Sequence, residues 1–244
     1  MKKTLFALLN GLLRRRGLTI APLRDDPRPY TTQEGLANAR RVVSSVGTVV
    51  DLGASNGAWS ERAMRIFPEA NYLLFEPLQE RLAALEALRA RHANVQFVMA
   101  VAGARPGRVA LEVAKDLDGS SVRAAAGGTS RDVPVVTVDD EIRTRRLPGP
   151  YLLKFDTHGY EAPILEGAAE TLRRTSLIVM EVYNFNVSPT ALRFPAMCLH
   201  LEQRGFRCYG IVDPLWRKKD AAFWQMDMLF CRAEADVFRS ETYA

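Results

Sequence analysis

Short apolar runs alternate with segments of helical periodicity along most of this chain. Runs rich in Val, Leu, Ile and Phe predict strands, and stretches with apolar residues every three or four positions predict helices. We expect strands at 48–53, 71–76, 95–101, 108–114, 133–138, 151–155, 176–182, 206–212 and 225–232. We expect helices at 31–45, 57–67, 77–92, 161–174 and, with an internal proline, 188–205.

Most of these strands are apolar at consecutive positions. This pattern is typical of parallel strands that are buried on both faces and joined by helices. The last two strands, 206–212 and 225–232, have no helix between them, so we expect them to pair antiparallel. The pattern therefore predicts an α/β fold, whose ligands bind beyond the carboxyl ends of the strands.

The first 30 residues differ from the rest. Residues 1–17 combine two lysines, a short apolar stretch interrupted by Asn10, and three arginines. The stretch is too short to span a bilayer and lacks a small-residue cleavage site. We expect an amphipathic helix that packs on the domain or a partner subunit, or lies on an anionic membrane surface. Residues 1–30 are thus an N-terminal helix and linker, and 31–244 a single domain.

Composition argues against a nucleic-acid-binding protein and against a cysteine metal site. The chain has 244 residues and a net charge of +5, and its basic residues are scattered. No zinc-finger or RNA-binding signature accompanies them, so we do not expect nucleic acid as a partner. The three cysteines lack metal-ligand spacing and predict free thiols in a reducing, cytoplasmic setting. A homo-oligomer remains open.

The first chemical motif is "VVDLGASNGAW" at 49–59. Gly53 and Gly57 flank a turn from strand to helix, where glycine allows close approach of a ligand. Asp51 can bind an amine or a hydroxyl, and Glu76, at the end of the next strand, can bind ribose hydroxyls. Ser55 occupies the middle glycine position of a dinucleotide fingerprint. The motif therefore favours S-adenosylmethionine (SAM), which carries a ribose and a cationic amino acid.

Several blocks of the chain together resemble the FkbM family of SAM-dependent methyltransferases. The family-like blocks are "VVDLGASNGAW", "LLFEPLQERLAAL", "VTVDDEI", "LLKFDTHGYEAPILEGAAETL" and "QMDMLFCR". The resemblance implies a class I methyltransferase (Rossmann-like) fold: a seven-stranded, mostly parallel sheet with one antiparallel strand and helices on both faces. It also implies methyl transfer to oxygen, often a hydroxyl of a sugar or a natural product.

The same resemblance implies a cofactor pocket. Adenine would lie near Ala100 and Val101, a stretch without the acidic residue that many methyltransferases use there, so backbone groups would recognise it. The cofactor-binding residues that we expect are Asp51, Gly53, Ala54, Ser55, Asn56, Gly57, Glu76, Pro77, Ala100, Val101 and Asp156.

The segment "KFDTHGYE" follows the strand at 151–155 and carries the predicted catalytic groups. Asp156 is our first choice: it can orient the acceptor hydroxyl, accept its proton, or bind the methionine amine of the cofactor. His158 has a pKa suited to base chemistry. Members of the family commonly carry Glu or Gln at its position, which favours an acceptor contact.

Further residues of this rim are expected to shape the acceptor site. Lys154 could instead form a structural ion pair, and Tyr160 could instead pack in the core. Asp156, Glu181 and Asn184 could together hold Mg²⁺, although we do not favour metal dependence. The predicted acceptor-binding residues are Lys154, His158, Tyr160, Glu181 and Asn184.

The sequence therefore predicts a SAM-dependent O-methyltransferase that acts on a small acceptor, such as a sugar, a glycan or a glycosylated natural product. A catalytically silent SAM-binding module is the first alternative. A nicotinamide-dependent oxidoreductase is the second, and Ser55 disfavours it.

Overall fold

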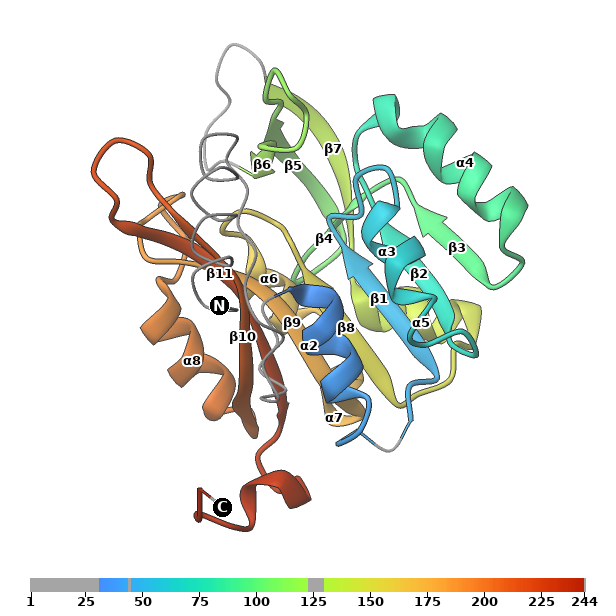
Figure 1. Ribbon diagram of the computed structural model, residues 1–244. Helices are drawn as coiled ribbons and strands as arrows, with labels where there is room; N and C mark the ends of the chain where they lie inside the picture. Colours follow the sequence, from blue (N-terminus) through green and yellow to red (C-terminus); the bar gives the residue numbers. More distant parts are fainter. Residues whose placement is uncertain (1–30, 44, 123–129, 244) are drawn as a thin grey trace, which may run out of the picture.

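The computed structural model describes residues 31–43, 45–122 and 130–243, and its centre is a seven-stranded sheet (Figure 1). All neighbouring strands are parallel except β11, which is antiparallel to both of its neighbours. This is the sheet that the resemblance implies. From edge to edge the strands are β10 (Phe206–Trp216), β11 (Phe223–Arg232), β9 (Thr175–Tyr183), β8 (Tyr151–Phe155), β1 (Thr48–Leu52), β2 (Asn71–Phe75) and β3 (Val95–Val98).

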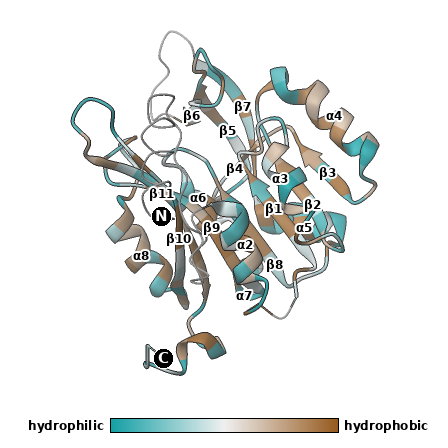
Figure 2. Cartoon of the chain, in the orientation of Figure 1, coloured by the Kyte–Doolittle hydropathy of each residue, from teal (hydrophilic) through white to brown (hydrophobic). Residues whose placement is uncertain are grey.

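Helices cover both faces of this sheet. One apolar core lies between the sheet and α2 (Thr32–Ala39), α3 (Ala58–Ala63) and α4 (Leu82–Arg91). The other lies under α5 (Val138–Arg145), α6 (Glu161–Glu166), α7 (Ala169–Arg173) and α8 (Phe194–Glu202). The central strands are mostly hydrophobic (Figure 2), although β1 contains Asp51 and β8 contains Lys154. Strands β1 and β8 are buried at every position, as their apolar sequences predict.

The strands expected at 108–114 and 133–138 form a separate sheet. It has the order β4-β7-β5-β6 and consists of β4 (Val101–Ala102), β5 (Gly107–Glu112), β6 (Ser121–Val122) and β7 (Ser130–Val136). The single strand expected at 95–101 is correspondingly divided, since β3 belongs to the main sheet and β4 to the small one. A third apolar cluster, which includes Leu78, Leu111 and Val135, lies beside this small sheet.

Several helices differ from expectation. The helix predicted at 161–174 is two helices, α6 and α7, separated at Gly167. A Cβ at Gly167 would lie 1.9 Å from the carbonyl oxygen of Gly103, so only glycine permits this approach. The proline expected inside a helix, Pro195, lies in the first turn of α8, where its missing N–H costs nothing. Helix α5 was not expected, and a 3₁₀ turn, η1 (Gln79–Arg81), precedes α4.

Helix α2 begins as its sequence predicts and ends earlier. Thr31 and Glu34 form the capping box, with the Thr31 hydroxyl accepting from the backbone N–H of Glu34. The predicted N-terminal amphipathic helix lies outside the described residues. Within the described ranges, no helix has the length and apolar character needed to cross a membrane.

Candidate active site

A cavity opens at the carboxyl ends of β1, β2, β8 and β9, where such sheets bind their ligands. The small sheet borders it through Leu111, Ser121 and Val122. Ten of the predicted site residues line this cavity: Gly53, Ser55, Glu76, Pro77, Ala100, Val101, Asp156, His158, Tyr160 and Glu181.

The glycine turn after β1 brings two strand ends close together. Gly53 has φ +79°, a left-handed conformation, and its N–H donates to the carbonyl of Phe75 over 3.1 Å. A Cβ at Gly53 would lie 2.0 Å from the carbonyl oxygen of Asp156. Glycine is therefore required here both by backbone conformation and by the neighbouring chain.

Glu76 is held by the main chain and faces the cavity. Its Oε2 accepts from the Ser55 N–H at 2.8 Å, and its Oε1 accepts from the Leu78 N–H at 2.9 Å. Each carboxylate oxygen has a second lone pair, which leaves acceptor capacity for a diol such as that of a ribose. Burial raises the pKa of Glu76, against the lowering effect of the two backbone hydrogen bonds.

Asp51 is placed differently from its predicted role. Its side chain is fully buried, and its Oδ2 accepts from the Ser60 hydroxyl at 2.7 Å. Its Oδ1 lies 2.9 Å from Nζ of Lys154, which also donates to the Gly53 carbonyl at 2.8 Å. Asp51 and Lys154 thus form a buried ion pair behind the cavity wall, in agreement with the ion-pair alternative for Lys154.

The remaining predicted residues do not line the cavity, as far as the described ranges show. Ala54 and Gly57 are buried in the turn, and the Asn56 Oδ1 accepts from the Ala58 N–H at the start of α3. Asn184 donates through Nδ2 to the carbonyl of Phe223 over 3.3 Å. These residues shape the walls rather than present polar atoms to the cavity.

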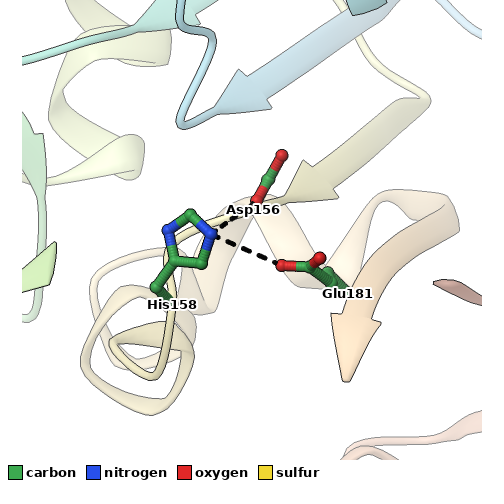
Figure 3. Close-up of side chains that lie close together, drawn as sticks. All are labelled: Asp156, His158 and Glu181. Carbon is green, nitrogen blue, oxygen red and sulfur yellow. Dashed lines mark ion pairs between the residues drawn. The ribbon is translucent and has the colours of Figure 1, made fainter. Parts of the chain in front are cut away.

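Asp156, His158 and Glu181 meet at one side of the cavity (Figure 3). Nε2 of His158 lies 3.5 Å from Oδ1 of Asp156 and 3.7 Å from Oε2 of Glu181. His158 has φ +52° and is followed by Gly159 at φ +99°, so a tight turn projects the imidazole toward the two carboxyl groups. We call these three residues the rim triad.

The two carboxyl groups of the rim triad differ in charge at neutral pH. Burial raises the pKa of Asp156, but the neighbouring Lys154 and His158 charges outweigh it, so this pKa lies below its ordinary value. Burial and the charge of Asp156 raise the pKa of Glu181 to about 8. Near pH 7 the pair therefore consists of an ionised Asp156 and a protonated Glu181, a combination common in acid–base sites.

Three polar residues near Glu181, namely Tyr183, Gln225 and Asp227, were not predicted from the sequence. Glu181 receives short hydrogen bonds from the hydroxyl of Tyr183 and from Nε2 of Gln225. Asp227 is the register partner of Glu181 across β9 and β11, and its carboxylate meets the Thr32 hydroxyl at 2.8 Å. "MEVYNF" and "QMDMLF" carry these polar side chains inside apolar strands, and that was the available signal.

The chain was compared with models of protein families and with curated protein sequences. The family described as "Methyltransferase FkbM domain" matches residues 51–208. No curated protein sequence matches the chain.

The chain also matches solved methyltransferase structures at low sequence identity, with TM-scores below 0.5. A methyltransferase FkbM from Methylobacillus flagellatus KT is 17% identical with a TM-score of 0.49; the match covers 75% of this chain and 43% of that one. An rRNA methylase from Streptococcus thermophilus is 11% identical with a TM-score of 0.46, covering 81% and 93%. A precorrin-6y C5,15-methyltransferase from Geobacter metallireducens GS-15 is 14% identical with a TM-score of 0.45, covering 85% and 95%.

Proposed function

The chain belongs to the methyltransferase FkbM family, and on that premise we propose that it is a SAM-dependent O-methyltransferase that acts on a hydroxyl of a sugar, a glycan or a glycosylated natural product. The observation that carries the proposal is a single cavity with two differently built sides. One side has the glycine turn and Glu76, and the other has the rim triad. Family membership also argues against the nicotinamide-dependent alternative.

The described residues fit the cofactor. Gly53 lines the cavity in a tight left-handed turn, and Glu76 beside it retains acceptor capacity for the ribose hydroxyls. The walls near Ala100 and Val101 are apolar and suit an adenine ring. When bound, SAM supplies an electrophilic methyl group, whose bond to sulfur breaks with its electron pair as the acceptor oxygen attacks.

The rim triad orients the acceptor and handles its proton. Ionised Asp156 accepts a hydrogen bond from the acceptor hydroxyl and directs the oxygen lone pair toward the cofactor side. Lys154, 3.4 Å from Asp156, holds that carboxylate in its charged form. As the new O–C bond forms, the hydroxyl proton passes to Asp156 and from there to water, a contribution of about 10²–10⁴ in rate.

Aromatic side chains next to the triad support a ring-shaped acceptor. The His158 and Tyr183 ring centroids are 6.4 Å apart, and Tyr183 meets Trp224 edge-on at 6.2 Å. Trp224 in turn stacks on Phe185 at 5.1 Å, and both are only partly buried. Such rings offer apolar surface for the faces of a sugar beside polar groups that bind its hydroxyls.

Calorimetry with SAM and S-adenosylhomocysteine, followed by assays of S-adenosylhomocysteine release with a panel of hydroxylated acceptors, tests this function. We expect SAM binding together with acceptor-dependent release. Absence of SAM affinity in the intact chain would contradict the proposal. SAM affinity without product for any acceptor would instead favour the silent binding module.

A further inference from the structure

The rim triad has the composition and spacing of a metal site. One ligand atom from each of Asp156, His158 and Glu181 lies within 4.8 Å of the other two. Neighbouring ligands of a metal at about 2.1–2.3 Å are roughly 3 Å apart and opposite ones about 4.5 Å apart. The His158 distances of 3.5 and 3.7 Å fall in this interval and are too long for good hydrogen bonds. A small closure around an ion would bring the three atoms to bonding distance.

The charged groups around the rim triad favour the binding of a cation. Lys154 is the nearest ammonium group, but the fully buried Asp51 already pairs with it at 2.9 Å. Among the described residues that line the cavity, the one arginine is Arg81, and it pairs with Asp118. Lys154 also lies 3.4 Å from Asp156, so one ammonium group faces the two carboxylates of Asp51 and Asp156. The ionised form of Glu181 would add a further negative charge, which a bound cation would balance.

The triad is also supported and accessible as a metal site requires. Tyr183 and Gln225 donate to the two oxygens of Glu181 and fix the orientation of its carboxyl group, as outer hydrogen bonds do for metal ligands. The exposed side-chain fractions are 40% for Asp156, 26% for His158 and 14% for Glu181. Because the three residues line the cavity, coordination positions would remain for water or an acceptor oxygen.

From this geometry we propose that Asp156, His158 and Glu181 bind one divalent transition-metal ion, of which Mn²⁺ is the representative. An imidazole among carboxylates favours such an ion over Mg²⁺ or Ca²⁺, which prefer oxygen ligands alone. Asn184, which the sequence offered as one possible oxygen ligand in a metal site that we did not favour, donates to the carbonyl of Phe223, and His158 is the third residue of the cluster instead. Building on the proposed function, the ion would bind the acceptor hydroxyl and lower its pKa beside the cofactor.

Electron paramagnetic resonance of free Mn²⁺ tests the site directly, without any turnover. Titration of the intact full-length chain should remove one equivalent of the free-ion signal, and excess Mg²⁺ should compete poorly. His158→Gln and Glu181→Gln should each weaken Mn²⁺ binding by at least about tenfold. His92→Gln is the matched control, since His92 lies at the surface near Glu61, and it should bind Mn²⁺ as the intact chain does.

Two outcomes would overturn the metal proposal: no loss of free signal at millimolar Mn²⁺, or equal affinity in the intact chain and His158→Gln. SAM calorimetry on the same samples shows whether each variant is folded, and it judges the proposed function separately. Mn²⁺ binding without SAM affinity would leave the metal site standing and refute the methyltransferase assignment. SAM affinity without Mn²⁺ binding would refute the metal site and leave the methyltransferase assignment unaffected.

Discussion

The two sides of the cavity are built by different parts of the chain. On the side of β1 and β2, backbone groups do the positioning: the Ser55 and Leu78 N–H groups hold Glu76, and Gly53 makes the turn. On the side of β8 and β9, side chains act on one another, with His158 at 3.5–3.7 Å from two carboxyl groups. The first side is thus preorganised, whereas the second has looser contacts and titratable groups.

This difference suits a division of labour. A cofactor that is the same in every cycle can be bound by backbone groups whose geometry scarcely depends on side-chain identity. Acceptor chemistry needs groups whose charge can change and whose spacing can close around a ligand. Substitutions on the first side should therefore change cofactor affinity, and those on the second side should change the rate.

The largest effect is expected at Gly53, where the two sides meet. Gly53→Ala places a Cβ 2.0 Å from the Asp156 carbonyl oxygen at a φ of +79°. We expect a loss of about 3 kcal/mol or more in the free energy of unfolding, measured by urea denaturation. Gly107→Ala is the control, because no atom lies within 4 Å of its added Cβ. Equal stability of the two variants would show that the strand ends are not held together at this turn.

Asp156→Asn should give the next largest effect and mark the acceptor side. The amide cannot accept the hydroxyl proton, so kcat should fall by about 10²-fold or more. The Kd for SAM should change less than about threefold. His158→Gln should lower kcat by less than Asp156→Asn. If Asp156→Asn retains full activity while His158→Gln abolishes it, the two residues have the opposite roles.

Glu76→Gln should mark the cofactor side. One of the two backbone N–H groups, of Ser55 or Leu78, would then face an amide NH₂ group instead of an oxygen. We expect the Kd for SAM to rise by about tenfold or more by calorimetry, with kcat at saturating SAM nearly unchanged. Glu80→Gln serves as the control, since that carboxylate pairs with Arg131. A fall in kcat without a change in the Kd for SAM would mean that Glu76 acts on the reaction rate and not on cofactor affinity, which would contradict the separate roles of the two sides.

The smallest effect concerns Asp227, whose burial raises its pKa to about 6. Because the folded state holds this proton more tightly than the unfolded chain, the free energy of unfolding should fall as pH rises from about 4 to 6. Asp227→Asn removes this loss and should stabilise the protein by about 1–2 kcal/mol at pH 7. The gain should vanish below pH 4.

Denaturation across pH 3–8 measures this effect. Asp236→Asn, at an exposed position, is the control and should change stability little at any pH. An advantage of Asp227→Asn that is the same at every pH would mean that the Asp227 carboxyl group does not titrate as described.

Local features were the ones that could be predicted from the sequence. The apolar runs identified every strand of the main sheet, and the spacing of Gly53 and Glu76 located one side of the cavity. Features that depend on contacts between residues far apart in the sequence were not predicted. The interruption at Gly167 depends on Gly103, 64 residues earlier by sequence number, and the separate sheet of β4 to β7 depends on pairing that periodicity does not specify.

The sequence by itself determined the α/β architecture and placed Gly53 and Glu76 at one side of the cavity, because hydrophobic period and glycine conformation act over a few neighbouring residues. The sequence also named Asp156, His158 and Glu181, but only the tertiary structure decided how these side chains are grouped and which charges surround them. The register of β9 against β11 puts Asp227 opposite Glu181, and parallel pairing of β1 with β8 puts Asp51 beside Lys154. That pairing turns Asp51 from a ligand candidate into a counter-ion. Asp156 and Glu181 are the carboxyl groups that lie beside His158 at one side of the cavity.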